Sequence, residues 1–344
     1  MKTLLLQKKL LGSMQNKVIQ NTVMYVTCLA LTACGSSSSD PGNSPTAKSS
    51  SPGAVSSASS SSASNAPVAI TIPFEAFSGS TEIKCGVALE GLGTVSTRAT
   101  VADFRFYIHN LLLVTSTGVE LPIALDENGL QVDNIALLDF RDKLGTGTTS
   151  CQGDANPALN KKITGKVLIG NNTVSSLRFV LGVPATHNHT DQTAAKEPLK
   201  TPGLSSGMHW GWNIGYKFTG IDLFTDVAIT RPGDATWTNN RWNIHLGSTG
   251  CTGAAAAGEK VVCTAENRAE ITLNDFVVGK SVVKLDLAKI VAKNNLGQDI
   301  ASSAGCMSGA TDSECAEIFA SFGLSHATQT SSPLAQTVFS LVTQ

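Results

Sequence analysis

The chain of 344 residues carries 25 basic and 26 acidic residues, a formal net charge of −1, and 42% of its residues are hydrophobic. This length suits one large domain or two small ones. Basic and acidic residues are nearly equal in number, and the lysines and arginines form no cluster along the sequence. A nucleic acid is therefore not expected as a partner, because nucleic-acid-binding proteins carry a basic patch.

Residues 1–33 are predicted to be a signal peptide. Four lysines and no acidic residue precede an apolar run from Val23 to Leu31, which is typical of a secretory signal. The run is too short to cross a bilayer. It ends in Leu-Thr-Ala followed by Cys34, which resembles the lipobox of bacterial lipoproteins. We therefore expect Cys34 to be lipidated, and Met14 is a second possible start of the same signal.

Residues 34–66 are predicted to be the lipidated cysteine and a flexible tether. Ser, Ala, Gly, Pro and Asn make up almost all of this stretch, and it cannot bury enough apolar surface to fold. The folded domain is expected over 67–344. Without the four lysines of the signal, 21 basic residues remain against 26 acidic ones, a charge of −5. Gly35 after the cysteine favours the outer membrane, with the domain facing the periplasm.

Six cysteines remain in the expected domain, and an even number in an oxidising compartment predicts three disulfides. Fifteen connectivities are possible. Two pairs would each close a short loop, Cys251 with Cys263 and Cys306 with Cys315, which leaves Cys85 with Cys151. Zinc binding is the alternative, although no Cys-x-x-Cys pair supports it. If all six are bridged, no thiolate is left for a blue-copper centre.

The pattern along the domain is strand after strand, separated by Gly, Pro, Asn or Asp. The expected strands, rich in β-branched and aromatic residues, are 68–74, 102–114, 130–140, 161–169, 175–183, 212–224, 241–247, 268–274 and 281–287. Helix is expected only near the C-terminus, at 286–294 and 313–322. Many short strands with turns between them predict a mainly β fold, an antiparallel β-sandwich with a few short C-terminal helices, stabilised by disulfides.

One connection is unusual. Residues 184–208 show no periodic pattern, and a loop of this length inside a compact domain is usually functional or disordered. It carries His187 and His189 and leads into the segment "MHWGWNIGYKF", residues 208–218.

Read as one strand, that segment would place Met208, Trp210 and Trp212 on one face and His209 on the other. Ordinary core packing is one interpretation, since a thioether packs well beside indoles. The glycines inside the segment weaken that interpretation. A further histidine, His245, lies in a strand whose apolar residues Trp242, Ile244 and Leu246 would face the other way.

Imidazole and thioether together suit a soft metal, above all Cu(I). An intact indole has no free lone pair on its nitrogen. Oxidative cleavage of the ring gives kynurenine, whose aromatic amine does have one. The segment therefore makes chemical sense as a copper site completed by modification of tryptophan.

Several segments resemble the MbnP family, also described as metallo-mystery-pair four-cysteine proteins. The match starts with "MHWGW" and its Trp-x-Trp motif. It continues, in order along the chain, with "DFRFYIHN", "LLDF", "LGVPATHNHTD", "IHLGSTGC" and "CMSGATDSEC", so that it covers about 70–344. The resemblance implies periplasm-facing copper binding. It also implies a diheme partner, MbnH, of the cytochrome c peroxidase/MauG type, which converts the first tryptophan of the motif to kynurenine.

The resemblance carries over to particular residues. Trp210 matches the modified tryptophan, and His245, His189 and Met208 are the expected metal ligands beside it. The four other histidines differ in their expected roles: His109 is expected to be a hydrogen-bonded core residue and His326 to be solvated, while His187 and His209 remain possible ligands. Trp237 and Trp242 are expected to pack.

Two other interpretations compete with this one, and the first of them stays open. The chain could be a surface sandwich without metal, in which the tryptophans form core or stack on a sugar. A copper enzyme finds no support in the residues, because a lipidated N-terminus cannot supply an amino-terminal histidine ligand. The sequence therefore predicts a copper-binding lipoprotein of the cell envelope that is not an enzyme.

Overall fold

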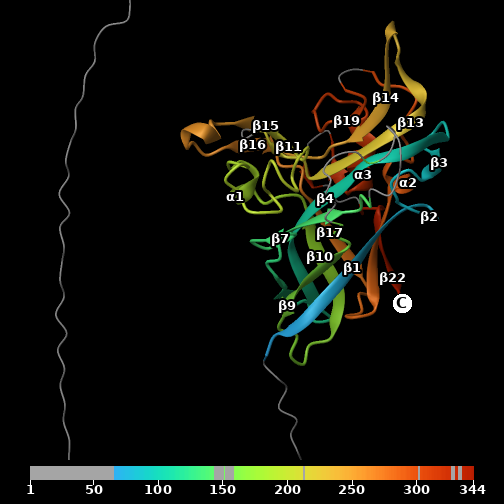
Figure 1. Cartoon of the computed structure of the whole chain (residues 1–344). Helices are drawn as coiled ribbons and strands as arrows, with labels where there is room; N and C mark the ends of the chain where they lie inside the picture. The colour runs from blue at the N-terminus through green and yellow to red at the C-terminus, as the bar shows by residue number, and fades with distance from the viewer. Residues whose placement is uncertain are drawn as a thin grey trace, which may run out of the picture. The chain divides into compact units, whose positions relative to one another are not determined.

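The computed structural model describes residues 66–142, 151, 159–211, 214–300, 303–326, 330–331 and 335–344 (Figure 1). The expected signal, Cys34 and all of the tether but its last residue lie outside the described residues, as does Trp212. Within the described ranges, no helix is both long and apolar enough to cross a membrane.

The larger of two main sheets carries the expected metal ligand His245 just after one of its strands. Its central path is β17 (Ala269–Asn274), β10 (Val174–Leu181), β4 (Thr97–Thr115), β13 (Thr219–Arg231), β14 (Asp234–Ile244) and β19 (Gly305–Cys306). Strand β4 also pairs with three further strands, β3 (Ala88–Leu92), β5 (Glu120–Pro122) and β8 (Ile135–Asp139). A short strand, β7 (Gln131–Val132), pairs with β8. Pairing is antiparallel except between β14 and β19.

The smaller sheet covers one face of the larger. Its path is β22 (Phe339–Thr343), β18 (Ser281–Asp286), β1 (Val68–Ser78), β9 (Lys162–Val167) and β6 (Ala124–Leu125), with β2 (Thr81–Glu82) beside β1. The β1–β18 pair is parallel. Aromatic rings fill the space between the sheets: Phe74 of β1 lies 6.5 Å from Phe106 of β4 and 6.0 Å from Phe179 of β10, measured between ring centroids. The expected β-sandwich is confirmed.

Three short hairpins and four short helices complete the described fold. The hairpins are β11 (His209–Gly211) with β12 (Gly215–Tyr216), β15 (Thr249–Thr252) with β16 (Val262–Ala265), and β20 (Leu324–Ser325) with β21 (Thr330–Ser331). The helices are α1 (Ala185–Asn188), the 3-10 turn η1 (Ala255–Ala257), α2 (Leu287–Ile290) and α3 (Cys315–Ser321). The two C-terminal helices were expected, but both are shorter than their periodic pattern.

Three disulfides join the pairs that the short-loop argument favoured. They are Cys85–Cys151, Cys251–Cys263 and Cys306–Cys315. The first links residues 66 positions apart in sequence, which constrains the unfolded chain far more than a local loop does. The second crosses the β15–β16 hairpin, where the two cysteines are directly paired.

Candidate metal centre

The two faces of the larger sheet differ in chemistry. On β13, Ile221 pairs with Phe104 of β4 and points into the sandwich, whereas its neighbours Gly220 and Asp222 lie on the opposite face. His245 follows β14, between the fully buried Ile244 and Leu246. As expected from the sequence, these apolar residues and the histidine face opposite ways, so His245 joins Asp222 on the polar face.

The segment 208–218, which is expected to be one strand, is a hairpin. Residues 208–218 turn back on themselves, so that His209 pairs with Tyr216 and Gly211 with Gly215. Gly215 has a φ of +89°, and a β-carbon there would lie 2.5 Å from Oδ1 of Asn188. That same oxygen accepts a hydrogen bond of 2.8 Å from the Tyr216 N–H. The expected single strand was wrong because a left-handed glycine and a contact with α1 close a turn.

Two expected site residues of this hairpin reach the polar face of the sheet. Met208 is fully buried, and its Sδ lies 2.3 Å from the position that a β-carbon on Gly220 would take. Trp210 is half-buried, and its Cζ3 lies 2.3 Å from where a β-carbon on Gly247 would be. Glycine at these two positions therefore makes room for the thioether and the indole. Trp212 is outside the described residues, so its predicted face stays a prediction.

His245 lies beside Trp210, with 6.4 Å between the ring centroids. Its Nε2 is 2.5 Å from Oδ1 of Asp222, and the other oxygen of Asp222 accepts from Arg241. Although burial opposes ionisation of Asp222, these two partners lower the pKa of its carboxyl to about 2. The Nδ1 of His245 is buried and has no hydrogen-bond partner among the described residues.

Sequence reasoning missed Asp222 and the close approach at Gly247. A signal for Asp222 was present: it is a carboxylate inside the apolar strand "TGIDLF", and a buried carboxylate requires a partner. Gly247 gave no such signal, because the residues next to it in the sequence do not show that the indole of Trp210, on β11, covers it.

His209 is a second imidazole with an unpartnered nitrogen. Its ring contacts Tyr216, with 4.6 Å between centroids. Nε2 is buried without a hydrogen-bond partner in the described part of the chain. Burial, aided by the nearby His189, lowers the pKa of His209 to about 4, so the ring is neutral at neutral pH and has a lone pair to offer.

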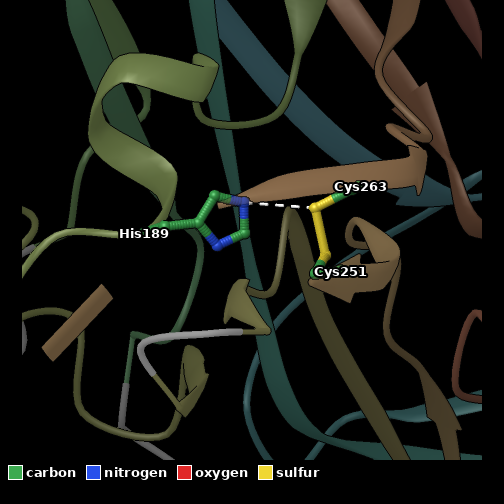
Figure 2. A group of neighbouring side chains, drawn as sticks. All are labelled: His189, Cys251 and Cys263. Atoms are coloured by element: carbon green, nitrogen blue, oxygen red, sulfur yellow. Dashed lines mark hydrogen bonds between the residues drawn. A yellow bond between two sulfur atoms is a disulfide. The ribbon is translucent and has the colours of Figure 1, made fainter. Parts of the chain in front are cut away.

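His189 lies against the Cys251–Cys263 disulfide (Figure 2). Its Nε2 is 3.3 Å from Sγ of Cys263 and 3.2 Å from the side-chain nitrogen of Asn188. Among the described residues, His189, Cys251 and Cys263 are the one group of three His, Cys, Asp or Glu donors within 4.8 Å of one another. Because thiolates bind metals and these sulfurs are bonded to each other, the group is no metal site while the disulfide stands.

The remaining candidates have structural partners. His109 Nδ1 donates to the Gly182 carbonyl at 2.8 Å, as expected for a core histidine. His187 lies on α1 with its Nε2 3.4 Å from Asp133. His326 is not simply solvated: Nε2 lies 2.8 Å from the Gly309 carbonyl oxygen and the ring packs on Phe319.

The two remaining described tryptophans pack as expected. Trp242 is fully buried. The Arg231 guanidinium lies over the indole of Trp237, with its Cζ 3.9 Å from the centroid of that ring.

These features define a class: a disulfide-linked β-sandwich that buries histidine, methionine and tryptophan side chains between its larger sheet and a covering hairpin. The MbnP family model matches residues 67–308, and the chain belongs to the MbnP family. Its structure is similar to that of MbnP from Methylosinus trichosporium, with a TM-score of 0.71, 29% sequence identity, and coverage of 81% of this chain and 99% of that one. No curated protein sequence matches the chain.

Proposed function

We propose that this protein binds Cu(I) at the polar face of its larger sheet, on His245, His189, Met208 and a kynurenine formed from Trp210. The observation that carries the proposal is the buried, unpartnered Nδ1 of His245 beside the Trp210 ring. A buried polar atom without a partner costs free energy, and a metal ion at Nδ1 would remove that cost.

The donor types support copper in its reduced state. Imidazole and thioether are ligands that Cu(I) accepts readily. Met208 packs on Gly220, and His245 is bonded to Asp222, two residues along the same face of β13. These contacts hold the thioether and the imidazole over neighbouring positions of one strand.

Trp210 would supply the remaining donor after oxidation. Its half-buried indole leaves an edge that an external oxidant can reach. Following the family resemblance, we assign the oxidation to an MbnH-like diheme protein of the cytochrome c peroxidase/MauG type. A peroxide oxidant would deliver two oxygen atoms that cleave the indole C2–C3 bond, and hydrolysis would then release the formyl group as formate. The aromatic amine of the resulting kynurenine has the lone pair that indole lacks.

His189 is the least supported member of the set, because its ring contacts the Cys251–Cys263 disulfide. It remains in the proposal as a residue of the loop that leads to the hairpin. His209, with its own unpartnered nitrogen, is the alternative second imidazole.

The proposed cellular role is copper homeostasis in the bacterial envelope, by binding rather than catalysis. A lipid on Cys34 would hold the domain on the outer membrane, facing the periplasm. The proposed partners are thus the membrane, through this anchor, and the diheme protein.

The test is to produce the protein with and without an MbnH-like diheme partner. Co-production should yield a Trp210 peptide that has lost one carbon and gained one oxygen, kynurenine absorbance and tightly bound copper. Trp210→Phe should abolish all three, whereas the control Trp237→Phe should keep them. Equal copper affinity in Trp210→Phe and modified wild type would refute the proposal, and absence of copper from every form would favour a surface sandwich without metal.

A further inference from the structure

The two ring nitrogens of His245 have different surroundings. Nε2 lies 2.5 Å from a carboxylate oxygen of Asp222. Nδ1 is buried and unpartnered among the described residues, in a side chain that is 6% exposed. A carboxylate accepts hydrogen bonds, so the nitrogen that faces it carries the proton. In a neutral imidazole the lone pair is then on the other nitrogen.

We propose that Asp222 is a positioning residue that holds His245 in the tautomer protonated at Nε2, so that Nδ1 presents its lone pair to copper. The part concerning copper rests on the proposed function. Metal-binding histidines commonly donate their second ring N–H to a carboxylate or carbonyl, which orients the ring and makes it a better ligand.

Asp222 is itself held in place. One carboxylate oxygen faces His245, and the other accepts from the guanidinium of Arg241. The side chain is 7% exposed, so water competes little for either oxygen. The carboxylate therefore cannot turn away from the ring without losing a buried hydrogen bond.

The backbone of His245 is fixed as well. Its N–H donates to the Cys306 carbonyl at 2.9 Å, and its carbonyl accepts from the Ser308 hydroxyl at 2.9 Å. With both backbone groups bound, the ring can move only by rotation about its own side-chain bonds. The bond to Asp222 then decides which ring nitrogen faces away from the carboxylate.

Nitrogen NMR of isotope-labelled histidine in the metal-free protein tests the tautomer directly. In wild type, the neutral ring of His245 should give the signal of the tautomer protonated at Nε2. Asp222→Asn should shift it toward the Nδ1-protonated form, because an amide N–H can donate to Nε2. A neutral ring protonated at Nδ1 in wild type would overturn the proposal without any variant.

Copper affinity tests the second part of the proposal, that Asp222 makes His245 a better copper ligand. In protein already converted at Trp210, Asp222→Asn should weaken Cu(I) binding about 10- to 100-fold in a chelator competition. The control is Asp226→Asn, which removes the same charge from an exposed residue of the same strand, β13, and should bind as wild type does. Thermal melts verify that both variants fold.

If Asp222→Asn fails to fold, Asp222→Glu keeps the charge but moves the carboxylate, and it should weaken binding while His245 stays protonated at Nε2. Unchanged copper affinity in both Asp222 variants would overturn the positioning role. A wild-type protein that takes up no copper would refute the proposed function, and with it the claim that Asp222 orients His245 for copper binding. The NMR result stands apart from copper and still decides the tautomer.

Discussion

The indole of Trp210 lies directly over the backbone of Gly247. A β-carbon at residue 247 would be 2.3 Å from Cζ3 and 2.9 Å from Cη2 of that ring. Gly247 is fixed in turn, since its N–H donates to Ser308 at 3.1 Å and its carbonyl accepts from Asn267 at 2.8 Å. The β-carbon would also lie 2.9 Å from the Tyr216 carbonyl oxygen, so the Trp210 ring and the backbone at Tyr216 must both shift when the space is filled.

Gly247→Ala should displace the Trp210 ring and lower the free energy of unfolding by about 1–3 kcal/mol, the usual cost of overpacking. It should also slow the conversion of Trp210 by the diheme partner, measured on the tryptic peptide. Gly309→Ala is the control, because its β-carbon would meet Asp312 at an ordinary 3.5 Å. Equal stability and equal conversion in Gly247→Ala and wild type would show that the contact is unimportant.

His245→Gln and His189→Gln should each weaken Cu(I) affinity in the modified protein, measured by competition with a chelator. In the first variant the amide can still donate to Asp222, so the buried carboxylate keeps both of its partners and the loss of stability should stay near 1 kcal/mol. If His189→Gln binds copper as wild type does while His209→Gln does not, His209 replaces His189 in the ligand set. Unchanged affinity in all three variants would contradict the assignment of imidazole ligands.

Mapping by mass spectrometry without reductant should find no free thiol among the six cysteines of the domain. Under a mild dithiol, Cys251–Cys263 should open first, because its two half-buried cysteines cross a hairpin, whereas Cys306 and Cys315 are fully buried. Alkylation followed by peptide mapping gives the order. Earlier labelling of Cys306 or Cys315 would contradict this, since it would require opening of the core.

His109 should make the protein less stable as the pH falls. Burial lowers its pKa from 6.5 to about 4, although the Gly182 carbonyl opposes the shift. Between these values the unfolded chain binds a proton that the folded chain does not, so this contribution is present in full above pH 6.5 and lost toward about pH 4.

Urea unfolding at several pH values should show wild type losing about 1–3 kcal/mol more than His109→Gln across this window. The other histidines are common to both proteins and cancel in the difference. Parallel pH profiles of the two proteins would show that His109 titrates alike in the folded and unfolded states.

The sequence by itself determined the features that depend on local periodicity. The alternation around His245 predicted that Trp242, Ile244 and Leu246 point into the sandwich, because successive side chains of a strand lie on opposite faces. All three are fully buried. The pairing of the two local disulfides likewise followed from short spacing along the chain.

Only the tertiary structure decided how the candidate site is built. Residues 208–218 form a hairpin because Asn188, from a different segment, binds the backbone at the turn. Asp222 reaches His245 across two paired strands, and the Cys251–Cys263 disulfide lies beside His189. Each of these contacts joins residues more than 20 positions apart, so neither the hydrophobic pattern nor the motif spacing could specify them.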